Sequence, residues 1–399
     1  MRILLLSNKS PWPPRDGGAF ATLNLIRCLY EIDVQTTVLA LNPDKHHINQ
    51  NAIPDEIKRL ADIKLVDTNT DISPFRLFVN LFFSGKPYNI TRFWSADYLN
   101  ELLNLRLDEF DLIQIEGLAM HQYLHVIKSI TNAPVIFRPH NIENMIWSGL
   151  SKEEGNIFRK IYFNILSSRI RETEEGIVNG FDALIPFSEA DLTWFVEKGL
   201  KKPSMINTIG FADRDIPASD NILKNTICFL GALDWLPNIN GLRWFIKNVW
   251  PLVLKNEPGA EFHIAGRNAS RKTLGEIHGR NVFYEGEVAS SEQFLKNNAL
   301  MVVPLFSGSG VRIKILEGMM IGKCIVATTV AASGIDYVDG ENIHITDRAT
   351  LFAEKIVKLM NNDNLRVTTG HNAIENVRKN YNILATSQRL SQFYQKLLA

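Results

Sequence analysis

The stretch Pro304–Val326, PLFSGSGVRIKILEGMMIGKCIV, decides the fold that this sequence of 399 residues predicts. Its composition indicates a strand over 299–305 and a glycine-containing loop over 306–310. Apolar residues at helical spacing then predict a helix over 311–321, and another apolar strand follows at 324–327. Because strand, loop and helix follow one another in this order in parallel α/β sheets, the stretch favours that class of fold.

The loop and the start of the predicted helix have the composition of an anion site. Gly308 and Gly310 let the backbone approach a ligand, and the N–H groups of a helix N-terminus attract negative charge. Arg312 and Lys314 add two cations where the helix dipole disfavours them, and Glu317 can accept hydrogen bonds from sugar hydroxyls. A surface helix with a Lys314–Glu317 pair would explain those two residues but not the glycines and Arg312 together. A phosphate-binding loop is therefore the preferred interpretation.

Length and composition favour a globular protein of two domains. The chain is too long for one ordinary core, and its 45% hydrophobic and 22% charged residues are typical of globular proteins. Lys plus Arg and Asp plus Glu number 43 each, so no global field attracts nucleic acid or an anionic membrane, which leaves room only for a local basic patch. Cys28, Cys228 and Cys324 lie far apart among apolar neighbours and indicate buried free thiols in a reducing compartment. With no apolar run long enough for a signal peptide or a membrane span, we expect a cytoplasmic protein.

Strand and helix signals alternate in two separate series. The first series ends at about residue 210, and the polar stretch Phe211–Asn225 links it to a second series that ends at about 382. An Asp-x-Asp at 213–215 falls in this linker, and we interpret it as turn chemistry rather than a metal site. The last predicted helix, over about 383–398, is amphipathic, with Leu384, Leu390, Phe393 and Leu397 on its apolar face. Two doubly wound domains are the architecture that this pattern predicts.

In the first series, polar residues stand where parallel sheets bind ligands, just past the carboxyl ends of strands. Glu116 ends one predicted strand, and His140 and Asn141 follow the next. For His140 the alternative is a surface loop histidine. Gly17 and Gly18 lie between the first strand and the first helix, a second potential anion site, although most such glycine pairs are only turns.

Further candidates follow strands of the second series, and one pair of histidines is set aside. Gly231, Arg267 and Gly286 stand at or just after the ends of predicted strands. They are candidates for the pocket formed with the glycine loop at 306–310. His121 and His125 are spaced as a zinc pair on a helix, but they lack a third ligand and an HExxH motif. No metal site is predicted.

Residues 72–94 combine seven aromatic side chains with three cations and no acidic residue. We prefer a helix packed on the core. The alternative is an amphipathic surface that faces an apolar acceptor or the inner face of the membrane. If the segment meets a lipid-linked acceptor, we expect some of Phe78, Phe82, Phe83 and Trp94 to be exposed near the mouth of a cleft, whereas burial of all four would favour the core helix.

Several motifs together resemble one known family. The most specific are PLFSGSGVRIKILEGMMIGKCIVAT and the later GIDYVDGENIHITD, supported by FLGALDW, HIAGR, FYEGEV, the DGG loop and RPHNIE. Over nearly its full length the chain resembles the group 1 retaining glycosyltransferases of GT-B fold. The resemblance implies two facing Rossmann-like domains with a cleft between them and a terminal helix that crosses back. An acceptor-side domain would comprise 1–210 with 383–399, and a nucleotide-sugar-binding domain 211–382.

The resemblance also implies roles in binding the donor. Glu317 matches a glutamate that binds ribose hydroxyls, and Gly310 and Val311 match backbone donors to the diphosphate. Gly286 and Val288 match the loop beside the base.

On the acceptor side, Gly17 and Gly18 match a loop that closes on the diphosphate or the acceptor. His140 matches a histidine at the reacting sugar, with Glu116 and Asn141 beside it.

Two departures from the family pattern affect the mechanism. Ser309 stands where many members have the first of two glutamates, so recognition of the donor sugar differs from theirs. Ala232 and its neighbours occupy a loop in which many members carry an arginine and a lysine. We therefore expect Arg312 and Lys314 to stabilise the leaving diphosphate.

The implied reaction transfers a sugar with retention of anomeric configuration. The donor would be a nucleoside diphosphate sugar, the acceptor a glycan, a lipid-linked or a small molecule, and neither a metal nor another cofactor is required. Polysaccharide or glycan synthesis is the expected context. The alternatives are a catalytically silent nucleotide-sugar-binding subunit, a GT-B nucleotide-sugar epimerase and a phosphorylase-like enzyme. A Rossmann dehydrogenase would need a GxGxxG after a strand, which the sequence lacks.

Overall fold

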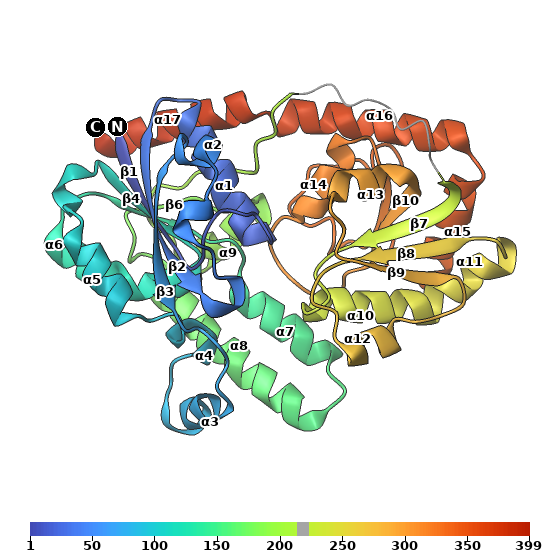
Figure 1. Cartoon of the computed structure of the whole chain (residues 1–399), viewed down its shortest axis with the longest axis horizontal. Helices are drawn as coiled ribbons and strands as arrows, with labels where there is room; N and C mark the ends of the chain where they lie inside the picture. The colour runs from blue at the N-terminus through green and yellow to red at the C-terminus, as the bar shows by residue number, and fades with distance from the viewer. Residues whose placement is uncertain (214–222) are drawn as a thin grey trace. The chain divides into compact units, whose positions relative to one another are not determined.

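The computed structural model describes residues 1–213 and 223–399. It divides into two compact units, Met1–Gly210 with Ile383–Ala399, and Phe211–Asn382, here called the first and second domains (Figure 1). Residues 214–222, which hold most of the expected linker and part of the Asp-x-Asp at 213–215, lie outside the described residues.

The first domain is built on a parallel sheet of six strands in the order β3-β2-β1-β4-β5-β6. The strands are β1 (Arg2–Ser7), β2 (Gln35–Pro43), β3 (Asp62–Thr68), β4 (Leu112–Glu116), β5 (Val135–Arg138) and β6 (Ala183–Leu184). The strand order changes direction between β1 and β4, which creates the switch point where open α/β sheets bind ligands.

Apolar residues fill both faces of this sheet. Along β1, Ile3 and Leu5 belong to one core cluster, whereas Leu4 and Leu6 belong to another, as the alternation of a strand requires. The helices between and after these strands are α1 (Gly17–Tyr30), α2 (Asp55–Lys58), α3 (Pro74–Phe83), α4 (Tyr88–Thr91), α5 (Ala96–Asn104), α6 (Leu124–Ile130), α7 (Glu143–Glu153), α8 (Ile157–Ile177) and α9 (Glu189–Glu197). Short 3-10 turns occupy 44–46, 50–52, 107–109 and 118–123.

The terminal helix α17 (Ile383–Leu398) packs on the first domain, as expected. Leu390, Phe393 and Tyr394 are buried in the same cluster as the apolar face of α1. Leu384, which the amphipathic pattern assigned to the buried face, is exposed instead.

The return point of the chain is tightly packed. A Cβ on Gly210 would lie 2.8 Å from the Cα of Ile383, so only glycine fits there.

The second domain repeats the design with the strand order β12-β11-β10-β7-β8-β9. Its strands are β7 (Leu223–Leu230), β8 (Glu261–Ala265), β9 (Val282–Gly286), β10 (Asn298–Val303), β11 (Cys324–Ala327) and β12 (His344–Ile345). Because β7 already begins at Leu223, the last three residues of the expected linker belong to a strand.

The helices of the second domain are α10 (Leu236–Trp244), α11 (Trp250–Asn256), α12 (Arg271–Glu276), α13 (Ser291–Asn297), α14 (Ile313–Met320), α15 (Ala349–Met360) and α16 (Asp363–Asn380). Between α10 and α11 the chain forms a π-helical segment, Phe245–Val249. Pro251 lies at the start of α11, and its missing N–H breaks the regular α-helical ladder at this point. All three cysteines are buried free thiols, as the sequence predicted.

Residues 72–94 differ from the preferred expectation, because α3 is not packed on the core. None of its residues is buried, and Phe78, Phe82, Phe83 and Trp94 are all exposed. The helix projects beyond the end of the sheet (Figure 1), where the described residues leave its apolar side uncovered. Only the following helix, α4, reaches the core, through Tyr88 and Ile90. Among the described residues, no helix combines the length and the hydropathy needed to cross a bilayer.

Candidate functional site

The first group of candidate residues lies at the carboxyl ends of β4 and β5. Strand register sets Glu116 beside Arg138, and Glu116 is fully buried. Its Oε2 accepts hydrogen bonds from Arg138 Nη1 at 2.9 Å and from His140 Nε2 at 2.8 Å. The structure therefore brings Glu116 and His140 into direct contact through a pairing that the sequence did not specify.

The negative charge of Glu116 determines that Nε2 of His140 carries a proton. Burial alone would raise the pKa of Glu116, but Arg138 and His140 more than offset it and hold that pKa at about 2. The carboxylate is therefore ionised and can only accept, so Nε2 of His140 must carry a proton. This arrangement orients the imidazole and fixes Nε2 as a hydrogen-bond donor.

A buried hydrogen-bonded chain extends from Glu116 to the terminal helix. Gln114 Nε2 donates to Glu116 Oε1 at 2.7 Å, and the Tyr394 hydroxyl donates to Gln114 Oε1 at 2.7 Å. Both side chains are fully buried. Sequence reasoning missed this chain because Tyr394 lies 280 residues from Gln114. The available signal was a lone glutamine inside the apolar strand LIQIE.

The Gly17–Gly18 loop lies against His140. Asp16 caps α1 by accepting from Ala19 N at 3.0 Å, and Lys9 Nζ bonds both Asp16 oxygens at 2.9 Å. A Cβ on Gly18 would lie only 3.1 Å from His140 Nδ1 and 3.2 Å from Lys9 Nζ. The absence of a side chain at Gly18 thus allows His140 and Lys9 to approach the loop closely. Lys9 was not among the residues predicted from the sequence.

Gly17 begins α1, and Asn141 continues the chain after His140. Both are at least partly accessible to solvent.

The second group of candidates surrounds Lys314 at the carboxyl end of β7. Lys314 Nζ donates to Asn238 Oδ1 at 2.9 Å and lies 4.4 Å from the ring centre of Phe229. A Cβ on Gly231 would lie 2.7 Å from that Nζ, so the glycine makes room for the lysine. Burial, with the charge of Arg312, lowers the pKa of Lys314 to about 7. A bound anion would raise that pKa again.

The expectation that Arg312 lies in the first turn of the helix is wrong. α14 begins at Ile313, and Arg312 is the buried residue before it, with φ −84° and ψ 89°. Its Nη1 donates to the carbonyl of Gly310 at 3.0 Å and also to that of Ser309. The guanidinium also lies 5.7 Å from the Trp235 ring centre. The helix starts later because this arginine holds the loop together from inside.

The glycine loop itself has the backbone that its sequence suggested. Gly308 and Gly310 have φ values of 118° and 76°, which favour glycine, and a Cβ on Gly308 would overlap Arg312 Nη2. Ser309 is buried, while Val311 and Glu317 are partly accessible. Glu317 lies one turn after Ile313 on α14.

The remaining donor-site candidates follow neighbouring strands. Arg267 follows β8, Gly286 ends β9 with φ 74°, and Val288 comes two residues later. Since β9 is the edge strand and β8 separates it from β7, Gly286 and Val288 stand two strands away from the Lys314 group.

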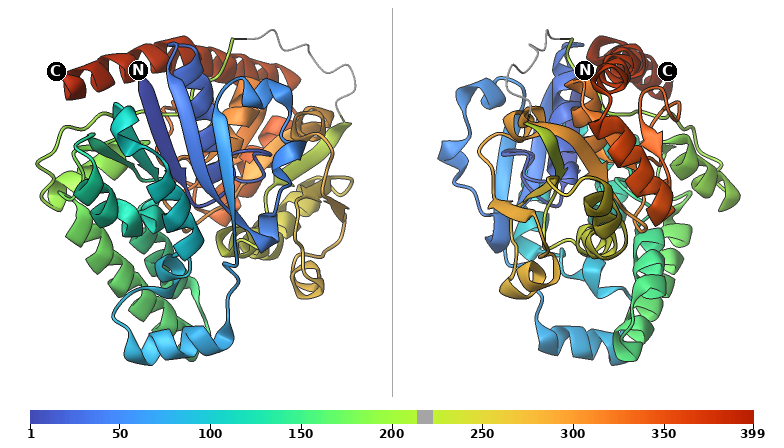
Figure 2. Two further views of the ribbon diagram at one scale, coloured as in Figure 1. Left: turned by 60° about the vertical axis from the view of Figure 1, so that its left-hand side comes forward. Right: turned by 90° about the vertical axis from the view of Figure 1, so that its right-hand side faces the viewer.

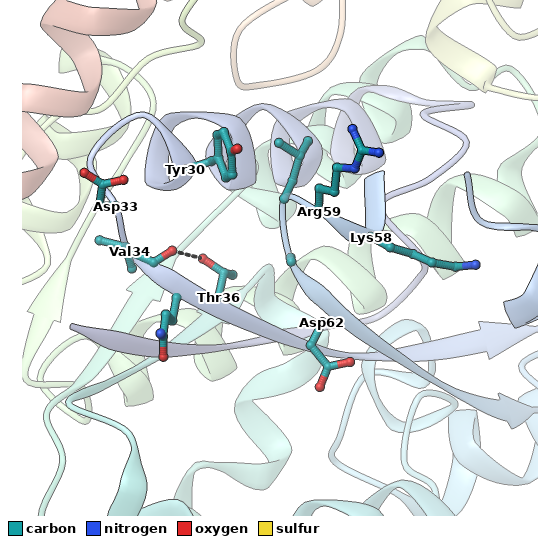
Figure 3. Close-up of a pocket in the computed structure, with 10 residues that line it drawn as sticks. Tyr30, Asp33, Val34, Thr36, Lys58, Arg59 and Asp62 are labelled. Atoms are coloured by element: carbon teal, nitrogen blue, oxygen red, sulfur yellow. Dashed lines mark hydrogen bonds between the residues drawn. The ribbon is translucent and has the colours of Figure 1, made fainter. Parts of the chain in front are cut away.

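A separate hollow of about 470 Å³ occurs at the amino-terminal ends of strands in the first sheet (Figure 3). It lies where β2 and β3 begin, and Tyr30, Lys58 and Asp62 line it. The strands are parallel, and Glu116 lies at the carboxyl end of its strand. The hollow at the amino-terminal ends of β2 and β3 is therefore at the opposite end of the strands from the Glu116–His140 pair.

Comparison with known proteins identifies the second domain. Residues 224–362, which include the Lys314 group and the glycine loop, match the family model for glycosyl transferases group 1. The chain carries a group 1 glycosyltransferase domain. Among similar proteins, an uncharacterised 44.6 kDa protein in the cps region of Klebsiella pneumoniae is 27% identical over 62% of this chain and 64% of its own length.

A poly(ribitol-phosphate) alpha-N-acetylglucosaminyltransferase of Staphylococcus aureus is 27% identical over 33% of this chain and 28% of its own. Both matches span less than two thirds of the relative.

Solved structures establish that the group 1 domain belongs to a chain of GT-B fold. S. aureus TarM, in a complex that contains UDP, matches 99% of this chain and 100% of its own with a TM-score of 0.68 at 13% identity. Sucrose-phosphate synthase from Thermosynechococcus elongatus matches 100% of this chain and 99% of its own with a TM-score of 0.74 at 12% identity. The expected fold of two parallel-sheet α/β domains is confirmed.

Proposed function

We propose that this protein is a retaining glycosyltransferase that moves a sugar from a nucleoside diphosphate sugar to a hydroxyl acceptor in glycan or polysaccharide synthesis. The observation that carries the proposal is the group 1 match over the domain that holds the glycine loop, Lys314 and Glu317. TarM, Anabaena HepE and pneumococcal GtfA were all solved with UDP, which supports a nucleotide-linked donor. The cps-region relative and the S. aureus transferase support a role in polysaccharide synthesis.

In this proposal the second domain holds the donor. Glu317 binds the two ribose hydroxyls, a charge-assisted pairing that is stronger than neutral hydrogen bonds. The backbone N–H groups of Gly310 and Val311 and the Lys314 ammonium face the diphosphate. Arg312 acts from inside, since its bonds to the loop carbonyls fix the conformation in which those N–H groups are presented.

The transfer breaks the bond between the anomeric carbon and the diphosphate oxygen, which leaves with the electron pair. The acceptor oxygen attacks from the same face, and its proton passes to the departing phosphate oxygen. Lys314 stabilises the charge that builds on the leaving group. His140, held in one tautomer by Glu116, orients the sugar.

A panel of nucleotide sugars, scored for nucleotide release and for glycosylated product by mass spectrometry, tests this function. We expect one donor to be turned over in the presence of an acceptor glycan, and Glu317→Gln to weaken its binding. A donor that binds with a stable calorimetric signal but is never turned over would instead identify a catalytically silent subunit. Interconversion of two nucleotide sugars without transfer would identify an epimerase.

A further inference from the structure

The first domain presents an apolar stripe that the described residues leave uncovered. On α3, Phe75, Phe78, Val79, Phe82 and Phe83 recur at the i, i+3, i+4, i+7, i+8 spacing that normally faces a core. All five are exposed, with Phe75 at 74% and Phe83 at 82%, and no residue of the helix is buried. A stripe with this spacing and this exposure indicates a surface that is covered by something outside the described chain.

The exposed helix is nevertheless held in place at both ends by polar contacts. Ser73 caps its start by accepting from Arg76 N, while its own N–H donates to the hydroxyl of buried Tyr88 at 3.1 Å. At the other end, Arg169 of α8 donates to the carbonyls of Asn80 and Leu81 at 3.2 and 2.7 Å. These contacts hold the helix to the domain and leave the aromatic stripe open.

A second exposed apolar segment lies toward the same end of the domain as α3. The start of α8 exposes Ile157, Phe158 and Ile161, with Phe158 at 79%. Figure 2 shows α3 and the start of α8 toward the same end of the domain in both views, and Arg169, farther along α8, makes the contacts with α3. Two segments about 80 residues apart in sequence thus contribute to one surface, here called the aromatic tip.

Cations predominate within the two segments of the aromatic tip, although Asp71 and Glu154 adjoin them and Glu154 pairs with Arg159 at 3.1 Å. Neither 72–94 nor 155–171 contains an acidic residue. Together they carry Arg76, Lys86, Arg92, Arg159, Lys160, Arg169 and Arg171. Since the whole chain is balanced, with 43 residues of each sign, this is a local concentration of cations around exposed aromatics. Such a surface complements an anionic bilayer, in which the rings enter the headgroup region and the cations meet phosphates.

We propose that the aromatic tip docks on anionic phospholipid membranes, with α3 lying in the plane of the interface. Membrane contact through residues 72–94 alone was an open alternative of the sequence, and the start of α8 extends it to a defined two-segment surface. Docking there would hold the first domain beside lipid-linked acceptors, a consequence that rests on the proposed transferase function. Membrane binding itself requires no donor and can be tested separately.

The test is co-sedimentation of the full chain with vesicles of phosphatidylcholine alone or with phosphatidylglycerol added. We expect binding to the anionic vesicles that weakens as salt is raised. The variant Phe75→Ser/Phe83→Ser/Phe158→Ser should lose roughly a hundredfold or more in vesicle affinity. Arg76→Ala and Lys160→Ala should each lose roughly fivefold. Because these five side chains are exposed, the melting temperature should not change.

The matched control is Phe283→Ser, an exposed phenylalanine of the second domain that should bind vesicles like the wild type. Equal binding to neutral and anionic vesicles, or wild-type binding by the triple variant, would overturn the proposal. A third outcome would also overturn it: the wild type is a dimer in sedimentation velocity, the triple variant is a monomer, and neither protein binds vesicles. In that case a second copy of the chain covers the aromatic tip. If the protein does not bind vesicles but still releases nucleotide from its donor, the membrane proposal fails and the proposed transferase function stands.

Discussion

At Lys314, one side chain links the pH of the solution to the binding of an anion. Its pKa is lowered to about 7 by burial and by Arg312, with only partial compensation from Glu317. A diphosphate beside its Nζ would raise that pKa, so binding above pH 7 takes up a proton. As the pH rises, the affinity begins to fall at the pKa of Lys314 in the free protein, and it stops falling at the higher pKa of Lys314 in the complex.

We therefore predict that the affinity for nucleoside diphosphate falls by up to about tenfold per pH unit above pH 7. Calorimetry in two buffers of different ionisation enthalpy measures the proton uptake directly. Lys314→Arg should bind with little pH dependence, because arginine stays charged, and it shares every other titrating group with the wild type. Equal slopes for the two proteins would show that Lys314 does not face the anion.

The same residue should matter more for turnover than for binding, since negative charge on the diphosphate grows as the glycosidic bond breaks. Lys314→Ala is expected to lower kcat by roughly a hundredfold. Steady-state kinetics with the cognate donor measures this, with melting temperature as the control for folding. Wild-type turnover would assign the stabilisation of the leaving group to other residues.

Glu317 gives a binding prediction of its own. Glu317→Gln removes the charge from the proposed ribose contact, and we expect the affinity for the nucleotide sugar to drop roughly tenfold to a hundredfold. Since the side chain is partly accessible, the melting temperature should not fall. An unchanged dissociation constant in calorimetry would rule out the ribose role.

Among the elements, α17 is connected to the candidate site through the hydrogen-bonded chain from Tyr394 through Gln114 to Glu116. Tyr394→Phe leaves the Gln114 carbonyl buried without its donor, which we expect to cost about 1–3 kcal/mol of stability. If Gln114 then shifts, Glu116 and His140 lose their fixed geometry, and kcat falls more than KM rises. Tyr381→Phe is the control, since it removes an equally buried hydroxyl that accepts from Asp336 N in the second domain. A variant that is less stable but has normal kcat would limit Tyr394 to a structural role.

The elements also show what the sequence could and could not reveal. Strand–loop–helix units such as 299–327 were predictable because buried strands and glycine loops are local signals. The later start of α14 was not, because it depends on the Arg312 side chain turning back onto its own loop. For residues 72–94, the composition indicated a helix, but composition alone does not say whether the core or something else covers its aromatic side chains.

At the scale of the whole molecule, the predicted features were those that recur along the chain, whereas long-range pairings were missed. Two βα series were enough to predict two parallel-sheet α/β domains, and the motifs that resemble group 1 glycosyltransferases led to the expectation of GT-B fold. The pairing of Glu116 with Arg138 and His140 depends on strand register, and the Tyr394 contact depends on the return of the last helix to the first domain. Neither leaves a periodic signal in the sequence.

The central claim is that this chain transfers a sugar with retention, and the product's anomeric configuration tests it most directly. The cognate nucleotide sugar and acceptor would be incubated with the wild-type chain, and the new glycosidic bond examined by NMR, with Glu317→Gln as the matched control. We predict a product with the same anomeric configuration as the donor, formed far more slowly by the variant. An inverted product, or no glycosidic bond while nucleotide sugar binds, would contradict the account.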